Sequence, residues 1–331
     1  MKSLFTIEET NELIRAGKCL MIAADEKLLA KLVTGNWIGG TIPYFMGDDG
    51  GAVRFDVLQV TQMPSEAVPR EIRNYSVSDI ESIPTHYPTN GFSQIIMPGT
   101  SAIQRVFAEK CSSWPGLFTR PLVGWVSGRH LDSNDIPKVI NGTTGKFSID
   151  EAVVIHFDLP ETKFARVHII NLFEEGEGDI ITFPERGFDV TACFVNGVPT
   201  NFAEFFTSRK RDPSLPLVAD FYGAKINVCV ESADAVSKKT RLAAPVFPGV
   251  TYRFAKPVAD YEEEFAKLIS DHAPDPIFMC NCVFNYVYAK LENKKTGPLK
   301  GPMTFGEIAY MLLNQTMVYL TLEEVAARQV S

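Results

Sequence analysis

Several polar residues lie inside apolar segments near the C-terminal end of this 331-residue chain. They are Asn281, Asn285, Glu307, Asn314 and Gln315. A buried amide or carboxyl group costs roughly a few kcal/mol unless it forms hydrogen bonds, so these residues either tie the core together or line a pocket for something polar. Both interpretations stay open. Convergent polar groups in an apolar cavity are typical of small-molecule sites.

Two thiols, Cys280 and Cys282, alternate along a predicted strand and so share one face of it. A closed zinc site needs four ligands, and neither a second cysteine pair nor a histidine doublet accompanies them. Cys282 directly precedes a predicted helix, whose N-terminus favours a thiolate. It is therefore the candidate nucleophile of a thiol enzyme whose base is a histidine remote in sequence, and an inert buried thiol is the other interpretation.

The remaining chemical signals are weaker. No G-x-S-x-G elbow, papain-type cysteine or P-loop lysine–serine pair is present. The glycines of residues 35–40 follow a helix and enter a strand, which is the reverse of the order that cradles phosphate. The acidic residues 174–179 lack EF-hand spacing and predict a hairpin turn. Among five histidines, His86 lies in a proline-rich loop and most resembles a ligand; we expect no cofactor, with haem binding through one histidine as an alternative.

Composition narrows the class of protein. The chain is 45% hydrophobic and 22% charged, which supports a large core, and its length predicts two structural units. The net charge of −8 argues against nucleic-acid binding, and the single basic run at 208–211 predicts a solvated helix end. The N-terminus lacks a signal-peptide pattern, and the apolar runs are far shorter than the ~20 residues of a membrane span. Cysteines scattered in apolar runs favour a reducing compartment, so we expect a cytoplasmic protein with no membrane contact.

The elements that must position these residues alternate between helix and strand. Thr6 and Glu9 form a capping-box pattern, which predicts a helix over 7–16 that Gly17 ends. A strand over 19–24, a helix over 26–33 and a strand over 37–45 follow, with a turn at 47–51. Residues 64–88 are rich in proline and charge and predict a surface excursion, before a strand at 93–98 and a helix at 101–111.

The second half of the sequence predicts mostly strands beyond Asn141, with a helix over 201–210. Near the end we expect a long helix over 260–272, a strand over 277–282, a helix over 284–293, two closing strands and a short helical tail from residue 323. The predicted fold class is α/β with mixed sheets flanked by helices. The predicted boundary lies at Asn196-Gly197, which gives parts 1–196 and 197–331.

These residues resemble the FIST sensory domains of bacterial signalling proteins. The segment from Cys282 to Asn285 is similar to a family strand that ends in cysteine with a polar residue three positions on. Residues 305–307 resemble the family's aromatic-Gly-Glu strand, and residues 314–316 its asparagine–threonine segment. Residues 37–41 and 122–125 are similar to its glycine-containing strands, and 190–199 to the joint between its two parts. Asn285 stands where the family often has arginine, which argues against an anion-binding role there.

The resemblance implies a two-part sensor module for small molecules such as amino acids, with haem in some members. We therefore expect a stand-alone sensor without catalysis, which binds a small polar molecule in a cleft between its parts and acts through a signalling partner or as an oligomer. Glu307 would meet an amine or hydroxyl, the asparagines would orient the ligand and Trp37 would supply an apolar wall. The predicted ligand-binding residues are Trp37, Gly39, Cys282, Asn285, Glu307 and Asn314.

Overall fold

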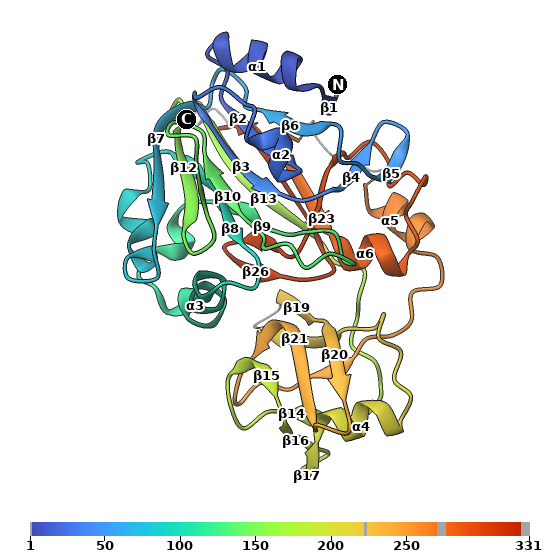
Figure 1. The fold of residues 1–331 in the computed structure, drawn as a ribbon. Helices are drawn as coiled ribbons and strands as arrows, with labels where there is room; N and C mark the ends of the chain where they lie inside the picture. The colour runs from blue at the N-terminus through green and yellow to red at the C-terminus, as the bar shows by residue number, and fades with distance from the viewer. Residues whose placement is uncertain (1, 222–223, 270–275, 326–331) are drawn as a thin grey trace, which may run out of the picture.

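A computed structural model describes residues 2–221, 224–269 and 276–325. Figure 1 shows a large body with a small lobe beneath it. Three six-stranded sheets form the body and three three-stranded sheets form the small lobe. The chain is a mixed α/β protein, as the sequence predicted. No helix among the described residues is both long and apolar enough to cross a membrane.

The first sheet holds the N-terminal strands in the order β1-β6-β2-β3-β10-β11. These strands are β1 (Leu4–Phe5), β6 (Leu58–Gln62), β2 (Leu20–Ala24), β3 (Trp37–Thr41), β10 (Val139–Asn141) and β11 (Lys146–Ser148). Helix α1 (Ile7–Arg15) begins at the predicted capping box, where Thr6 and Glu9 bond reciprocally. Helix α2 (Glu26–Leu29) is a single turn between β2 and β3, which run parallel, and it is shorter than predicted.

The second sheet has the order β26-β25-β9-β8-β12-β7. Its strands are β26 (Met311–Leu313), β25 (Glu307–Ala309), β9 (Leu122–Ser127), β8 (Gly91–Pro98), β12 (Ala152–Asp158) and β7 (Val68–Tyr75). The helices beside it are α3 (Ala102–Lys110) and the 3-10 helices η1 (Ile80–His86), η2 (Cys111–Ser113) and η3 (Leu117–Thr119). The surface excursion predicted over 64–88 is wrong, because β7 pairs with β12 along its length and η1 follows. As an edge strand, β7 tolerates the proline and charges that hid it.

The third sheet joins strands from distant parts of the chain in the order β13-β27-β23-β24-β4-β5. They are β13 (Lys163–Ile170), β27 (Met317–Glu324), β23 (Phe278–Cys282), β24 (Gly301–Thr304), β4 (Tyr44–Gly47) and β5 (Gly50–Val53). Helices α5 (Tyr261–Ile269) and α6 (Val283–Tyr288) flank β23 in sequence. The predicted turn at 47–51 is confirmed by the β4–β5 hairpin. The predicted tail begins inside β27, and its residues 326–331 lie outside the described part, as does the end of the long helix predicted over 260–272.

The small lobe is an insertion between β13 and α5. Its strands are β14 (Ile181–Thr182), β15 (Gly187–Val190), β16 (Ala192–Val195), β17 (Val198–Asn201), β18 (Leu217–Phe221), β19 (Ala224–Val228), β20 (Val230–Asp234), β21 (Lys239–Val246) and β22 (Arg253–Phe254), with helix α4 (Phe202–Ser208). Asn196 and Gly197, both with positive φ, form the turn of the β16–β17 hairpin. The predicted boundary between parts 1–196 and 197–331 therefore falls at a turn inside this lobe, and both parts supply strands to the second and third sheets of the body.

Close packing joins the sheets of the body. A Cβ atom on Gly40 of β3 would lie 2.8 Å from the side chains of Ile96 and Trp125, so only glycine lets the first sheet approach the second here. The core continues into the small lobe, where Phe188 and Val246 belong to the same buried cluster as Phe107 of α3. The lobe is thus packed against the body by apolar contacts as well as by the polar ones described below.

Candidate functional site

The structure brings four of the six predicted ligand-binding residues to one buried region. Cys282 ends β23, Asn285 lies in α6, Glu307 begins β25, and Asn314 follows Leu313, which pairs with Glu307 across β25 and β26. All four are at most 2% exposed. Together with Asn281, Thr304, Gln315 and Thr316 they form what we name the amide–carboxyl cluster.

Glu307 is the only carboxyl group of this cluster. Its Oε2 accepts hydrogen bonds from the backbone N–H and the hydroxyl of Thr316, at 3.2 and 2.8 Å, and its Oε1 accepts one from the Thr304 hydroxyl at 3.4 Å. Complete burial raises the pKa of Glu307 to about 8, although these bonds and the Cys282 thiol favour the charged form. At neutral pH the carboxyl group is therefore mostly protonated and can itself donate a hydrogen bond.

Cys282 lies beside Glu307 at the junction of β23 and α6. Burial, and next the negative charge of Glu307, raise the pKa of its thiol well above the ordinary value. The backbone N–H groups of Gln315, Phe284 and Asn285 face its sulfur and act in the opposite direction. The thiol is protonated at neutral pH, and the three N–H groups are in place to stabilise negative charge on the sulfur.

Three amides of the cluster have fixed orientations. Asn281 Oδ1 accepts from the Cys282 backbone N–H at 2.7 Å and from Asn285 Nδ2 at 2.8 Å. Asn314 Nδ2 donates to the Leu313 carbonyl at 2.9 Å. Because a backbone N–H can only donate and a carbonyl can only accept, none of these amides can be reversed without losing a bond.

Two acceptors of the cluster lack a partner. Asn285 Oδ1 and Asn314 Oδ1 are buried and form no hydrogen bond within the described part of the chain. Burial raises the pKa of Tyr261, and a hydrogen bond from the Asn281 side chain opposes this shift, so the Asn281 amide has a partner in that hydroxyl. Most buried polar groups in proteins are satisfied, so each exception calls for an explanation. The cluster thus offers two free acceptors of known identity.

The cluster lies at the junction of the body and the small lobe. Asn227 of β19 donates to the Asn314 carbonyl at 3.1 Å, and the Cys229 thiol donates to Gln315 Oε1 at 3.0 Å. Gln315 Nε2 in turn donates to the Ser214 carbonyl at 3.0 Å. Sequence reasoning missed Asn227, Cys229, Thr304 and Thr316. Of these four residues only Thr316 could have been inferred, because it directly follows Asn314 and Gln315 in the sequence.

The structure does not bring Trp37 and Gly39 to the cluster. Trp37 is fully buried in the first sheet, and its indole N–H donates to the Val33 carbonyl at 2.9 Å. It packs in a separate core with residues of α1, β2 and β10. A Cβ atom on Gly39 would lie 3.1 Å from both the Ile140 side chain and the Ile22 carbonyl, so this glycine serves the packing of neighbouring strands.

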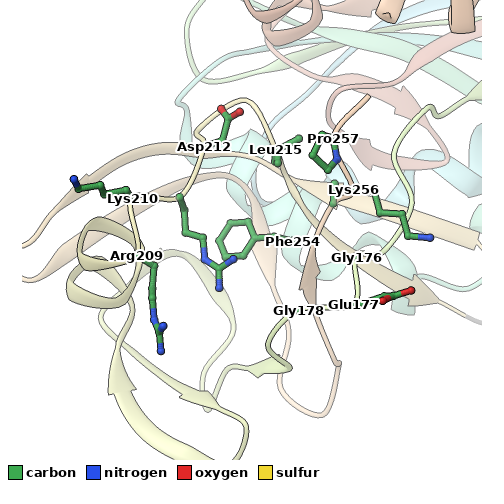
Figure 2. Close-up of a pocket in the computed structure, with 12 residues that line it drawn as sticks. Gly176, Glu177, Gly178, Arg209, Lys210, Asp212, Leu215, Phe254, Lys256 and Pro257 are labelled. Carbon is green, nitrogen blue, oxygen red and sulfur yellow. The ribbon is translucent and has the colours of Figure 1, made fainter. Parts of the chain in front are cut away.

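A cavity of the small lobe, about 540 Å³, is lined by Arg209, Lys210 and Arg211 of the basic run singled out in the sequence. Figure 2 shows that the side chains of Arg209 and Lys210 extend away from Lys256, so the cations do not converge on one point. Arg209 and Lys210 directly follow α4, where cations favour the helix C-terminus, in keeping with the predicted solvated helix end. No residue of the amide–carboxyl cluster lines this cavity.

The described histidines all contact other side chains or backbone groups. His86 Nε2 lies 2.6 Å from Arg73, His168 stacks on Tyr319, and His130 Nδ1 accepts from the Asp132 backbone N–H. His156 is enclosed by Ser93 and Tyr75. His272 lies outside the described residues. Within the described ranges no group of three or more histidine, cysteine or acidic side chains could hold a metal ion.

His156 provides a pH-dependent contribution to stability. Its ring nitrogens lie 2.7 Å from the Ser93 hydroxyl and 3.1 Å from the Tyr75 hydroxyl, and burial lowers its pKa to about 4. The unfolded chain therefore binds a proton between about pH 6.5 and 4 that the folded chain does not bind, so stability falls as pH decreases through this range. We expect His156→Gln to remove about 2 kcal/mol of this loss, measured as the difference in urea unfolding between pH 4.5 and 7. An unchanged difference between the two pH values would contradict the assignment.

Comparison with known proteins gives a family but no activity. Residues 5–323 match a protein family described as a family of unknown function (DUF6976). The match covers nearly the whole chain, which therefore belongs to this family. Neither a curated protein nor a solved structure matches the chain.

Proposed function

We propose that this chain is a cytoplasmic sensor that binds a small, neutral, polar molecule at the amide–carboxyl cluster. The observation that supports the proposal is the pair of buried amide oxygens without partners, Asn285 Oδ1 and Asn314 Oδ1. Leaving such atoms unpaired costs about 1–3 kcal/mol each, which a ligand that pairs with them would recover. The expected resemblance to FIST sensory domains points to the same class of function and stays a prediction.

The chemistry of the cluster favours a neutral ligand. No cationic side chain in the described part of the chain hydrogen-bonds to Asn285, Glu307 or Asn314. A carboxylate, such as that of a free amino acid, would enter without a counter-charge and pay a desolvation penalty. A primary amide or urea group supplies two N–H donors, one for Asn285 Oδ1 and one for Asn314 Oδ1.

The position of the cluster suggests how binding is signalled. Asn314 and Gln315 belong to the amide–carboxyl cluster of the body. They also form hydrogen bonds with three residues of the small lobe, which are Asn227, Cys229 and Ser214. A ligand that shifts the 314–316 segment would change these contacts and so the balance between positions of the lobe. A partner protein that recognises the lobe would then bind with different affinity in the presence and in the absence of the ligand.

A thermal-shift and calorimetric screen tests the proposal. Acetamide, propionamide and urea should raise the melting temperature and acetate should not, and saturation at 100 times Kd corresponds to about 2.7 kcal/mol. Asn285→Leu should abolish binding at a cost of no more than about 1 kcal/mol of stability, because it removes one hydrogen bond, to Asn281 Oδ1, together with an unpaired acceptor. Gln59→Leu, which replaces a buried amide of the first sheet, is the control and should bind normally. Equal binding by Asn285→Leu and the native chain would overturn the proposal.

A thiol enzyme is the second candidate. It is favoured by the three backbone N–H groups at the Cys282 sulfur and by Glu307, whose minor ionised form can accept the thiol proton in place of a histidine. Mapping of iodoacetamide labelling at pH 7 distinguishes the two candidates. Fast labelling of Cys282 that Glu307→Gln abolishes would favour the enzyme, and an inert Cys282 under native conditions would favour the sensor.

A further inference from the structure

A second cavity, of about 380 Å³, lies where β2, β3 and β9 end, and we name it the strand-end cavity. Its lining residues belong to the segments 25–30, 41–43 and 128–136, together with Phe55. Strands β2 and β3 are parallel, and ligands of open α/β sheets bind at the carboxyl ends of such strands. No residue of the amide–carboxyl cluster lines this cavity. Its volume is in the range of small-molecule sites.

Thr41 fixes the base of the strand-end cavity. Its buried hydroxyl donates to the Gly128 carbonyl at 2.8 Å and accepts from the Lys138 backbone N–H at 3.0 Å. The Gly128 backbone N–H donates to the Thr41 carbonyl at 2.7 Å. These bonds connect the ends of β3 and β9 with the chain that enters β10, so the lining segments are held together before any ligand binds.

Aromatic and apolar side chains form one part of the lining. Phe55 is 52% exposed and Ile136 is 59% exposed, although both are large hydrophobic residues. The His130 ring lies 6.0 Å from the Phe55 ring and stacks on the Tyr44 ring at 5.6 Å. A planar ring bound here would cover apolar surface that otherwise faces water.

Charged side chains of both signs form the other part of the lining. Glu26 is paired with Lys138 at 2.6 Å. Arg129 opposes the rise in pKa that burial causes at Glu231 of the small lobe, but it forms no ion pair there. Among the described residues, the charged lining groups without an ion pair are the two carboxylates of Asp25 and Asp135 and the two cations of Lys27 and Arg129. The charges that face a ligand therefore cancel.

This balance defines the polarity of a fitting ligand. A ligand with a net charge would leave one sign of the lining in excess, so a neutral molecule fits best. The carboxylates can only accept hydrogen bonds, and the lysine and arginine side chains can only donate them. A ligand that pairs with both kinds of group must carry acceptors and donors around its rim.

We propose that the strand-end cavity binds a neutral heteroaromatic molecule of the purine-base class. The ring lies against Phe55, His130 and Ile136. A purine such as adenine carries ring-nitrogen acceptors beside an exocyclic amino donor, so its rim offers partners to the cations and to the carboxylates. This site is separate from the amide–carboxyl cluster and does not depend on the function proposed for it.

Calorimetric titration with bicyclic probes of matched shape tests this site. Adenine should bind, and two other probes should bind at least about tenfold more weakly: indole, which has no ring acceptor, and urate, which is an anion at neutral pH. Tighter binding of adenosine than of adenine would assign the site to a nucleoside, and the reverse to a free base; both results support recognition of the base. Equal affinities for adenine, indole and urate, or no binding of adenine and adenosine, would overturn the proposal.

Variants of exposed charged residues test the balance of charge. Asp135→Asn leaves the lining with an excess of positive charge, so the affinity for urate relative to adenine should rise at least about fivefold. Lys27→Gln should shift this ratio in the opposite direction. Because both positions are exposed, neither change should affect folding. An unchanged ratio in both variants would exclude contact between the ligand and these charges and with it the proposed ligand class.

Three further variants locate the site. Phe55→Ala, at an exposed position, should weaken the binding of adenine and indole alike, because both rings lose the same apolar contact. Glu161→Gln, at an exposed carboxylate outside the cavity, should leave the ratio of urate to adenine unchanged. Asn285→Leu should leave adenine binding unchanged, because it alters only the amide–carboxyl cluster. Full adenine affinity in Phe55→Ala would place the ligand elsewhere and overturn the proposal.

Discussion

Glu307→Gln will flatten the dependence of stability on pH between about pH 4.5 and 8. In the folded chain the pKa of Glu307 is raised from 4.5 to about 8 by burial. The folded state therefore holds a proton that the unfolded state releases, so the contribution is fully present below pH 4.5 and is lost as pH rises toward 8. The loss is on the order of 4 kcal/mol. Glutamine imitates the protonated acid and carries no such loss.

Urea unfolding at pH 5, 7 and 9 measures this effect. The variant and the native chain should be of similar stability at pH 5, and the variant should be the more stable at pH 9. His156 contributes an opposite slope below pH 6.5 in both proteins, so it cancels in the comparison. Glu161→Gln, at an exposed carboxyl, should follow the native curve. Parallel curves for Glu307→Gln and the native chain would show that Glu307 is ionised in the folded state.

Trp37→Ala will lower the free energy of unfolding by about 3–5 kcal/mol, since it leaves a large cavity in the first sheet. Trp37 is fully buried, and the indole also occupies the space beside Gly142, where a Cβ atom would lie 2.3 Å from the ring. Thermal and urea unfolding measure the loss.

Trp37→Phe separates packing from ligand contact. Phenylalanine keeps most of the apolar volume but loses the bond to the Val33 carbonyl, so stability should fall by less than in Trp37→Ala. Binding of neutral amides at the amide–carboxyl cluster should be unchanged, because Trp37 packs elsewhere. Loss of amide binding at unchanged stability would restore Trp37 as a ligand contact.

Local signals in the sequence predicted much of the fold. The capping box at Thr6, the buried run of β23 and the turn between β4 and β5 each depend on neighbouring residues, and the structure contains all three. Strand β7 escaped detection because an edge strand exposes charged residues along one side. The pairing of β13 with β27 could not be foreseen, since it joins residues from Lys163 with Glu324 to Ile170 with Met317, which lie on either side of the inserted lobe in the sequence.

Part of the amide–carboxyl cluster could be predicted, because polar residues that lie within apolar runs of the sequence stand out. Asn285, Glu307 and Asn314 stand out because amide and carboxyl groups are unusual in apolar runs, and the structure brings them together. Thr304 and Thr316 gave no such signal, because threonine is common in strands. Asn227 and Cys229 reach the cluster only through the packing of the lobe.

Calorimetric titration of acetamide into the native chain and into Asn285→Leu tests whether the amide–carboxyl cluster binds a neutral ligand. We expect saturable binding of one molecule to the native chain and no binding to the variant, which should stay folded and lose no more stability than one hydrogen bond contributes, about 1 kcal/mol. Acetate, titrated in parallel, should not bind. Binding of equal affinity to both proteins, or no binding of any neutral amide to the native chain, would show that the unpaired atoms of the cluster belong to the core and do not form a ligand site.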